Sequence, residues 1–426
     1  CSSDLGGGPI TIANSGKMSK GIKTKATATI NGGTITLTPS GAMGTATVNG
    51  TIDASYSTGV KAVDFVMNDG SLTINSSGTA GKGISTTGIT TNGGTINITN
   101  SGAAQSASGG DYYTAKGMKA DGNMALNAGN ITIKMTGKGG KGIKSDGTFT
   151  MGRTDETGPT LNVSTSGSSV GSSSSGGGGG FGPGGMGQES GGSGSAKAVK
   201  VQGTVTLYGG ESTIGTSTDG AEGLESKTAV YIEGGKHYLK CYDDCINSSG
   251  NIYFNGGVTV CYSNGNDAVD SNAGKSGAIT IGNGTVFAYT TKGSPEEGLD
   301  CDNNSYIQIT GTGIALSAGG AQGGGSSSSI SNAKQGYYFY TSTISYTANR
   351  YYTLADASGN NLVTYSFPAS ISSTMSVFTA TGMTKGQSYT VKYSTSAPTD
   401  ATTSFHGLYL GSSAKGTTSV CSFTAK

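Results

Sequence analysis

The sequence predicts an all-β protein: a right-handed parallel β-helix (a solenoid) of about ten coils, followed by a β-rich C-terminal capping segment. Three observations support this. One unit recurs down the chain, each unit alternates apolar and polar residues with a period of two, and Gly-Gly or Asn-Gly pairs separate the alternating runs. No segment has helical periodicity. Because a coil of two or three short strands cannot bury its apolar face alone, the units must stack.

The repeat places a small apolar residue between polar neighbours, then a turn and one or two strands. The first copy is KGIKTKATATINGGTITL from Lys20, and the last is EGLDCDNNSYIQITGTG from Glu297. Copies without insertions recur every 22 to 25 residues, within the range of repeat proteins. The central apolar residues are Ile22, Val60, Ile84, Met118, Ile143, Val199, Leu224, Ile246, Val269 and Leu299.

These patterns divide the chain into three parts. Residues 1–14 read as an N-terminal tether and residues 15–334 as the β-helix. The β-helix is interrupted by a low-complexity Gly/Ser insertion at 166–195 and a shorter one at 318–329. Residues 335–426 are richer in aromatic residues, and we expect them to cap the open end of the stack, as repeat proteins require.

Composition limits the partners of the chain. The formal net charge is +1 and only 12% of residues are charged, so bulk electrostatics favour neither nucleic acid nor an anionic membrane. No apolar run approaches the roughly 18 residues that span a bilayer. The chain begins CSSDLGGG, which is typical of a processed bacterial lipoprotein. We therefore expect a monomer, exported and lipidated on Cys1, anchored to the outer membrane at the cell surface. A chain trimmed at that point is the alternative.

Stacking turns two positions of the repeat into columns, which we expect along the outside of the β-helix. Both columns are basic in the early coils and acidic in the late ones, with the change between Lys200 and Glu222. Two residues before the central one stand Lys20, Lys82, Lys116, Lys141 and Lys197, then Glu222, Asp244, Asp267 and Glu297. One residue after it stand Lys23, Lys61, Lys119, Lys144 and Lys200, then Glu225, Asn247, Asp270 and Asp300.

The acidic part predicts bound calcium. Two unit charges about 5 Å apart repel by roughly 3 kcal/mol at an effective dielectric of about 20. Ca²⁺ relieves this repulsion by taking about six to eight oxygen ligands. Protonation, or screening of solvated carboxylates, is the alternative. The expected ligands are Asp219, Glu222, Glu225, Asp243, Asp244, Asn247, Asp267, Asp270, Glu296, Glu297, Asp300 and Asp302. Histidine or thiolate metal sites are not expected, since the chain has two histidines and no CxxC pair.

Aromatic and basic residues predict a carbohydrate surface. Tyr231 and Tyr253 hold equivalent outward positions in VYIEGG and IYFNGG, so we expect them to stack into a flat aromatic strip suited to sugar faces. Lys119, Lys144 and Lys200 are spaced to hold an acidic polysaccharide. Aromatic ladders also stabilise sheets without any ligand, and lysines on an exposed edge are commonly only solvated.

No catalytic residues are expected. Neither histidine lies in a nucleophile motif, and stacked carboxylates provide no unique acid/base pair. A polysaccharide lyase, with Ca²⁺ and Lys200 or Lys227 as base, is one alternative function. A structural adhesin without sugar specificity is another.

Several motifs together resemble a known family. The repeats KGIKSDG, EGLESK, DAVDSN and EGLDCD, the insertion GGGGGFGPGGMG and the terminal QSYTV resemble the carbohydrate-binding family typified by clostridial surface proteins that bind cellulose and pectate. The resemblance covers about residues 15–400, as in a Bacteroides-like surface lipoprotein. It implies a lyase-like right-handed β-helix that carries calcium on the acidic turns and binds cellulose or polygalacturonate without cleaving it. Asn247 and the cysteines within the acidic repeats depart from the family pattern.

Overall fold

The computed structural model describes residues 9–48, 51–107, 111–155, 157–171, 194–274, 278–301, 306–321 and 329–426. In these ranges the regular elements are β-strands, without an α-helix, and so without a helix long and apolar enough to cross a membrane. Cys1, Asp302, and the greater part of both predicted insertions lie outside the described residues. The chain divides into two compact units. The first comprises Cys1–Thr148, Thr160–Val201 and Gly215–Glu222, and the second Phe149–Pro159, Gln202–Ile214 and Gly223–Lys426.

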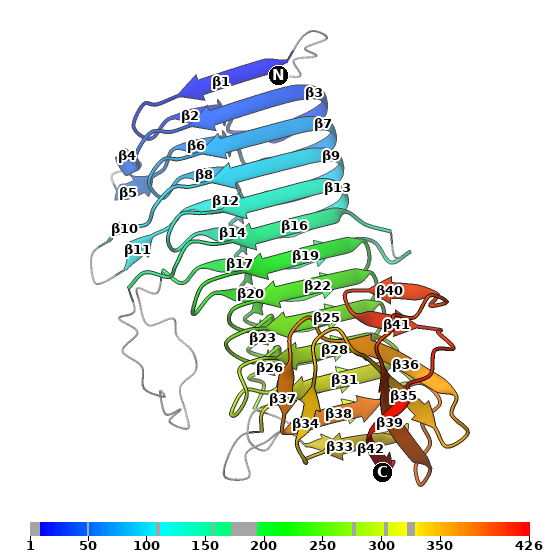
Figure 1. The fold of residues 1–426 in the computed structure, drawn as a ribbon. Helices are drawn as coiled ribbons and strands as arrows, with labels where there is room; N and C mark the ends of the chain where they lie inside the picture. The colour runs from blue at the N-terminus through cyan, green and yellow to red at the C-terminus, as the bar shows by residue number, and fades with distance from the viewer. Residues whose placement is uncertain are drawn as a thin grey trace. The chain divides into compact units, whose positions relative to one another are not determined.

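The first unit is built from two columns of parallel strands (Figure 1, blue to green). Each strand pairs in parallel with its equivalent one coil away. The short column contains β2 (Lys20–Lys23), β6 (Thr58–Lys61), β8 (Lys82–Thr86), β12 (Lys116–Ala120), β14 (Lys141–Ser145) and β17 (Lys197–Val201). The long column contains β1 (Ile10–Asn14), β3 (Ala28–Pro39), β7 (Asp64–Ser76), β9 (Gly88–Asn100), β13 (Met124–Met135) and β16 (Thr160–Thr165).

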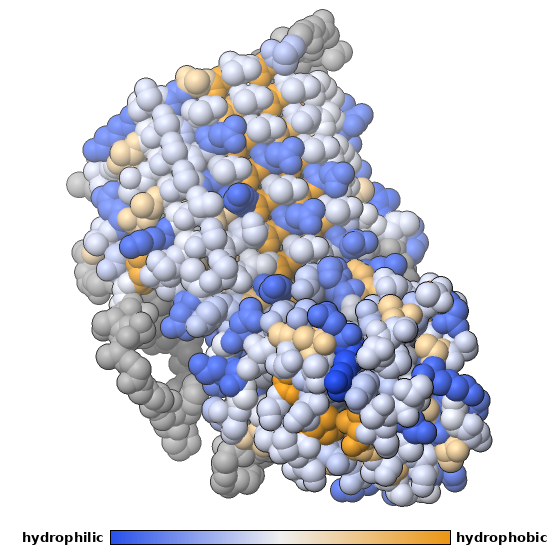
Figure 2. Space-filling view, in the orientation of Figure 1, coloured by the Kyte–Doolittle hydropathy of each residue, from blue (hydrophilic) through white to orange (hydrophobic). Residues whose placement is uncertain are grey.

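Two small antiparallel hairpins extend from these coils. They are β4 (Gly44–Val48) with β5 (Thr51–Ser55), and β10 (Gln105–Ser106) with β11 (Tyr112–Tyr113). Figure 2 shows the face formed by the long strands as mainly hydrophilic or near-neutral, with narrow hydrophobic lines running from coil to coil. Those lines follow from the period-two alternation, which directs every second side chain inward.

The second unit continues the same construction with three columns. The first contains β20 (Glu222–Ser226), β23 (Ile246–Ser248), β26 (Val269–Ser271) and β29 (Leu299–Cys301). The second contains β15 (Phe149–Met151), β18 (Val205–Leu207), β21 (Val230–Ile232), β24 (Ile252–Phe254), β27 (Ile279–Ile281), β30 (Ile307–Ile309) and β32 (Ile330–Ser331). The third contains β22 (Lys236–Cys241), β25 (Val258–Ser263), β28 (Thr285–Thr290) and β31 (Ile314–Gly319), and β19 (Glu211–Thr216) lies where the two units divide.

The predicted register is confirmed. In the first unit Ile22, Val60, Ile84, Met118, Ile143 and Val199 pair in succession. In the second unit Leu224, Ile246, Val269 and Leu299 do the same. All of these side chains are buried except Ile22 of the first coil, which is partly exposed. The predicted all-β parallel β-helix is therefore the observed fold.

Several coils have glycine immediately before the central apolar residue, and the reason is steric. A Cβ on Gly59 would lie 2.7 Å from the carbonyl oxygen of Gly83, and one on Gly83 would lie 2.4 Å from that of Gly117. Such approaches are closer than van der Waals contact allows, so the coils stack at this point only without a side chain.

The C-terminal segment is antiparallel and packs on the second unit's own coils. β38 (Met375–Thr379) pairs with β31 and with β33 (Tyr337–Tyr340), so the last long strand is not left as an open edge. A six-stranded sheet follows in the order β40 (Thr403–Phe405), β41 (Leu408–Leu410), β36 (Asn361–Ser366), β35 (Tyr351–Asp356), β39 (Ser388–Ser394) and β42 (Thr418–Thr424). β34 (Ile344–Tyr346) pairs with β37 (Ile371–Ser373).

An aromatic core joins this sheet to β28. The ring of Phe367 lies 5.2 Å from that of Phe287, 5.0 Å from that of Tyr289 and 4.5 Å from that of Tyr346. All four side chains are buried. Edge-to-face and tilted contacts of this kind add to the free energy gained from burial alone.

Candidate functional site

Tyr231 on β21 and Tyr253 on β24 stack as predicted. The two residues pair in register, their ring centroids are 4.6 Å apart, and the ring planes differ by 7°. At that spacing the rings lie face to face, so the prediction of a flat strip is wrong. One face of each ring is covered by the other ring, and the outer faces lie toward the coils of Thr206 and Thr280, the register neighbours on either side. We call this pair the tyrosine stack.

Two residues after each tyrosine stands a polar residue, Glu233 in one coil and Asn255 in the next. Asn255 Nδ2 donates a hydrogen bond of 2.9 Å to Glu233 Oε1. A carboxylate and an amide beside partly exposed aromatic rings offer both an acceptor and a donor for sugar hydroxyls. Sequence reasoning missed this pair, although the aligned repeats YIEGG and YFNGG place the two residues at equivalent positions. Burial raises the pKa of the Tyr231 hydroxyl, with a smaller contribution from Tyr253.

Comparison with known proteins adds one finding. Residues 153–268 match a family model described as carbohydrate-binding domain-containing protein. No curated protein and no solved structure matches the chain. The tyrosine stack and the Glu233–Asn255 pair both lie inside the matched residues. The similarity covers about a quarter of the chain, and the predicted lipoprotein and lyase-like features stay predictions.

The basic columns have the predicted register but not the predicted exposure. Lys116 pairs with both Lys82 and Lys141, and Lys141 with Lys197. Yet Lys82 is only 4% exposed. Its Nζ donates a hydrogen bond of 2.6 Å to the carbonyl of Thr114 and lies 4.0 Å from the ring centre of Tyr56. The expectation of an outer strip is therefore wrong here, because segments leading into the coils cover this edge. Burial, with repulsion from Lys119 and Lys141, lowers the Lys82 pKa to about 7.

The three lysines predicted to bind glycans differ in environment. Lys119 forms an ion pair with Asp121 and lies 3.7 Å from Asp146, which pairs with Lys144. Lys200 is 2% exposed, so its predicted surface position is wrong. All three lie in the first unit, whereas the tyrosine stack belongs to the second. Their role in binding stays a prediction.

The acidic positions are also more buried than predicted. In the column one residue after the centre, Glu225 pairs with Asn247, Asn247 with Asp270, and Asp270 with Asp300. Of the twelve predicted ligands, the side chains of Glu225, Asp244, Asp267, Glu297 and Asp300 are buried. Glu222, Asp243, Asn247, Asp270 and Glu296 are partly exposed, and Asp219 is exposed.

Local contacts relieve part of this charge. Asn247 Nδ2 donates to Asp244 Oδ2 at 2.8 Å and to Asp270 Oδ2 at 3.2 Å. The main-chain N–H of Glu297 donates to Asp267 Oδ1. Burial raises the pKa of Asp267 well above its usual value, and the charges of Asp300 and Asp270 raise it further. Carboxyl groups are therefore crowded where water is scarce, which favours either protonation or a bound cation.

The donor chemistry suits a hard cation, because the side chains offer oxygen alone. Among the described residues, however, no three His, Cys, Asp or Glu side chains converge closely enough to hold a metal ion. An ion on this edge would need further oxygens from asparagine side chains, main-chain carbonyls or water. Calcium binding stays a prediction.

The change from basic to acidic residues creates a buried ion pair. Lys197 Nζ lies 2.8 Å from Glu222 Oε2, with side chains 7% and 16% exposed. Lys227, one of the two lysines considered as a lyase base, forms an ion pair with Glu225. Sequence reasoning located the change of sign but missed the Lys197–Glu222 pair. The signal was available, since the two residues hold the same position in consecutive repeats.

Breaking this pair is expected to destabilise the first unit. Glu222→Gln removes the carboxylate charge 2.8 Å from the largely buried Lys197 ammonium, and we expect a loss of about 3 kcal/mol in the free energy of unfolding. Urea denaturation followed by circular dichroism measures it. The exposed carboxylate variant Asp219→Asn is the matched control and should change stability little. Equal stability of Glu222→Gln and wild type would contradict a structural role for the pair.

His237 contacts a serine but not as a catalytic dyad. Its Nε2 donates 2.8 Å to the carbonyl of Gly234, so Nδ1 accepts a hydrogen bond from the Ser212 hydroxyl at 2.9 Å. Both side chains are buried, out of reach of a polysaccharide. Burial lowers the His237 pKa to about 4. The imidazole therefore stabilises the fold only in its neutral form.

This burial predicts acid sensitivity. Because the unfolded histidine binds its proton near pH 6.5 and the folded one near pH 4, stability falls as pH falls between these values. The His237 contribution to that loss is about 3 kcal/mol, from about 1.4 kcal/mol per pKa unit. Urea midpoints measured from pH 7 to pH 4 should depend less on pH in His237→Gln than in wild type. Parallel curves for the two proteins would exclude the histidine as the cause.

Proposed function

We propose that the protein is a non-catalytic polysaccharide-binding protein and that the tyrosine stack is its sugar-binding surface. The observation that carries the proposal is the stacking of Tyr231 on Tyr253 inside the residues that match a carbohydrate-binding family model. Thr206, the register neighbour of Tyr231, is smaller than a tyrosine ring and partly exposed, whereas Thr280 beside Tyr253 is buried. The C–H groups of a sugar ring therefore pack on the outer face of the Tyr231 ring in this proposal. Glu233 and Asn255 then provide hydrogen bonds to its hydroxyls.

The ligand in this proposal is a cellulose-like or acidic pectic glycan, and the protein holds it without cleaving it. The chemistry of the charged columns supports the absence of cleavage. Lys200 is buried, and Lys227, whose side chain is 31% exposed, is held in an ion pair with Glu225. Lipidation of Cys1 and anchoring at the cell surface belong to the same proposal as predictions.

Removing the aromatic faces is expected to weaken glycan binding. The variant Tyr231→Ala/Tyr253→Ala should lose about tenfold in affinity, since aromatic contacts contribute about 0.5–1.5 kcal/mol each. Affinity electrophoresis in gels containing a soluble β-glucan or polygalacturonate measures retention. The control is Tyr351→Ala/Tyr409→Ala, a pair in T-shaped rather than stacked contact, with planes at 69°.

Unchanged retention of the first double variant would overturn the assignment of the tyrosine stack. Incubation with polygalacturonate, followed by ultraviolet absorbance, tests the absence of cleavage. An unsaturated product that disappears in Lys200→Ala would establish the lyase alternative instead.

We also propose that Ca²⁺ binds at the acidic positions of the second unit. The crowding of Asp267, Asp270 and Asp300, with the raised pKa of Asp267, supports this proposal. A ligand that binds only the folded state stabilises it, by about 2.7 kcal/mol at a hundred times its dissociation constant. Thermal unfolding with CaCl₂ should therefore occur at higher temperature than with EGTA. The increase should shrink in Asp270→Asn/Asp300→Asn, and identical melting temperatures in CaCl₂ and EGTA would refute structural calcium.

A further inference from the structure

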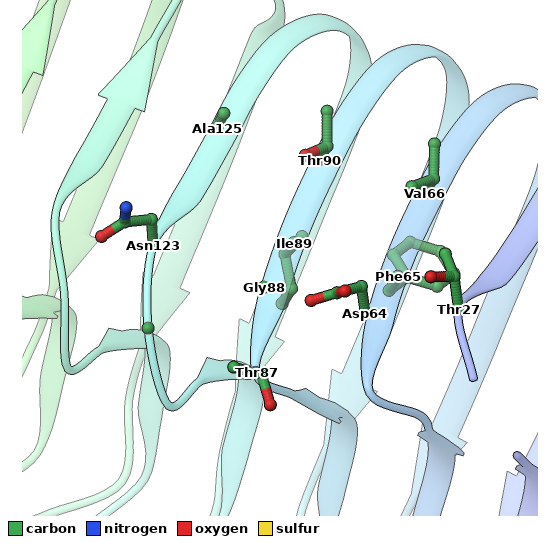
Figure 3. A pocket seen from close by; sticks show the side chains of 11 residues that line it. Thr27, Asp64, Phe65, Val66, Thr87, Gly88, Ile89, Thr90, Asn123 and Ala125 are labelled. Carbon is green, nitrogen blue, oxygen red and sulfur yellow. The ribbon is translucent and has the colours of Figure 1, made fainter. Parts of the chain in front are cut away.

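A groove of about 570 Å³ is lined by residues of four successive coils of the first unit, from Thr27 to Ala125, far along the sequence from the tyrosine stack. Figure 3 shows side chains from β7, β9 and β13 along it. Val66, Thr90 and Ala125, from three of these coils, pair in register and form a largely apolar floor. All residues that line this groove precede residue 153, where the carbohydrate-binding family match begins.

One wall of the groove has a gap. Asp64 pairs with Gly88, and Asn123 occupies the equivalent position on the following coil. Gly88 thus leaves one coil without a side chain between a carboxylate and an amide. A Cβ on Gly88 would lie 2.8 Å from Asp64 Oδ1, so the carboxylate leans over the space that a side chain would fill. Adjacent coils lie about 4.8 Å apart, so Asp64 and Asn123 start roughly 10 Å apart along the stack.

The polar groups beside this gap are complementary. Asn123 Oδ1 accepts a hydrogen bond of 2.9 Å from the main-chain N–H of Thr148. This bond fixes the orientation of the amide and identifies Nδ2 as its donor group. The wall therefore presents a hydrogen-bond acceptor at Asp64 and a donor at Asn123. Val63 precedes Asp64 in the chain and is 44% exposed. Its carbonyl accepts a hydrogen bond of 2.6 Å from the main-chain N–H of Thr87, which lines the groove.

We propose that this groove is a second carbohydrate site, which takes a neutral sugar chain with one ring seated over Gly88. The inference rests on the proposed polysaccharide-binding function. Sugar hydroxyls both donate and accept, so one ring satisfies Asp64 and Asn123 together, while its C–H face lies on Val66, Thr90 and Ala125. Asp64 is the one charged residue among those lining the groove. Its carboxylate disfavours acidic glycans by like-charge repulsion, so the groove selects uncharged chains.

The experiment counts sites with cellohexaose as the probe, by isothermal titration calorimetry on the whole protein. Wild type should bind two equivalents, and Tyr231→Ala/Tyr253→Ala should retain one. Adding Gly88→Gln, which fills the gap, should abolish the remaining binding. Adding Asp64→Ala instead should weaken it at least tenfold. Asn75→Ala, an exposed residue elsewhere on β7, is the matched control and should change nothing.

Each outcome separates the two proposals. If the tyrosine variant binds no cellohexaose, the groove is not a site and the tyrosine stack stands. If adding Gly88→Gln or Asp64→Ala leaves the binding of the tyrosine variant unchanged, the groove is not a site, and the stack stands only where wild type binds one equivalent more than that variant. If groove variants alone abolish binding, the tyrosine stack fails and the groove stands. Hexagalacturonate should bind the groove at least tenfold more weakly than cellohexaose, and equal affinity would overturn its selectivity. Circular dichroism spectra matching wild type confirm that each variant is folded.

Discussion

Parallel register between successive coils is the constraint on which the rest of this structure depends. Every residue lies about 4.8 Å from its equivalent in the next coil, so like residues are brought together whether or not they attract. Apolar residues gain from this, as in the interior column from Leu224 to Leu299. Repeated glycine also favours stacking, because a side chain at Gly59 or Gly83 would hold the coils apart. Like charges are destabilising where they meet, as Lys116 does with Lys82 and Lys141, or Asp270 with Asp300.

The protein manages repeated charge by pairing it locally rather than by exposing it. Ammonium groups on the basic column donate to main-chain carbonyls, as Lys82 does to Thr114. Among the carboxylates, the Asn247 amide donates to Asp244 and Asp270. Where the sign changes, Lys197 and Glu222 neutralise each other. The crowding of Asp267, Asp270 and Asp300, which raises the pKa of Asp267, is the physical basis for proposing a cation there.

The same register explains how a repetitive chain produces individual surfaces. A residue that differs from the repeat at one position, in one or two coils, is enough to create a distinct surface. Two tyrosines in consecutive coils form an aromatic stack in the second unit, and one glycine in a polar column opens a gap in the first unit. In the two proposals, the ligand lies over Thr206 in one case and over Gly88 in the other. Both proposed sites are thus exceptions within regular columns.

The sequence by itself determined the coil architecture, the register of the central residues and the stacking of Tyr231 on Tyr253, because all three follow from a local pattern repeated at nearly constant spacing. It also located the change from lysine to carboxylate. Only the tertiary structure decided that these columns are covered, since the covering groups, such as Tyr56 and Thr114 over Lys82, come from non-repeating segments. The tertiary structure also decided that each tyrosine ring covers one face of the other, so that the pair does not form a flat surface. The gap at Gly88 likewise needed three dimensions, because its walls come from residues in different coils.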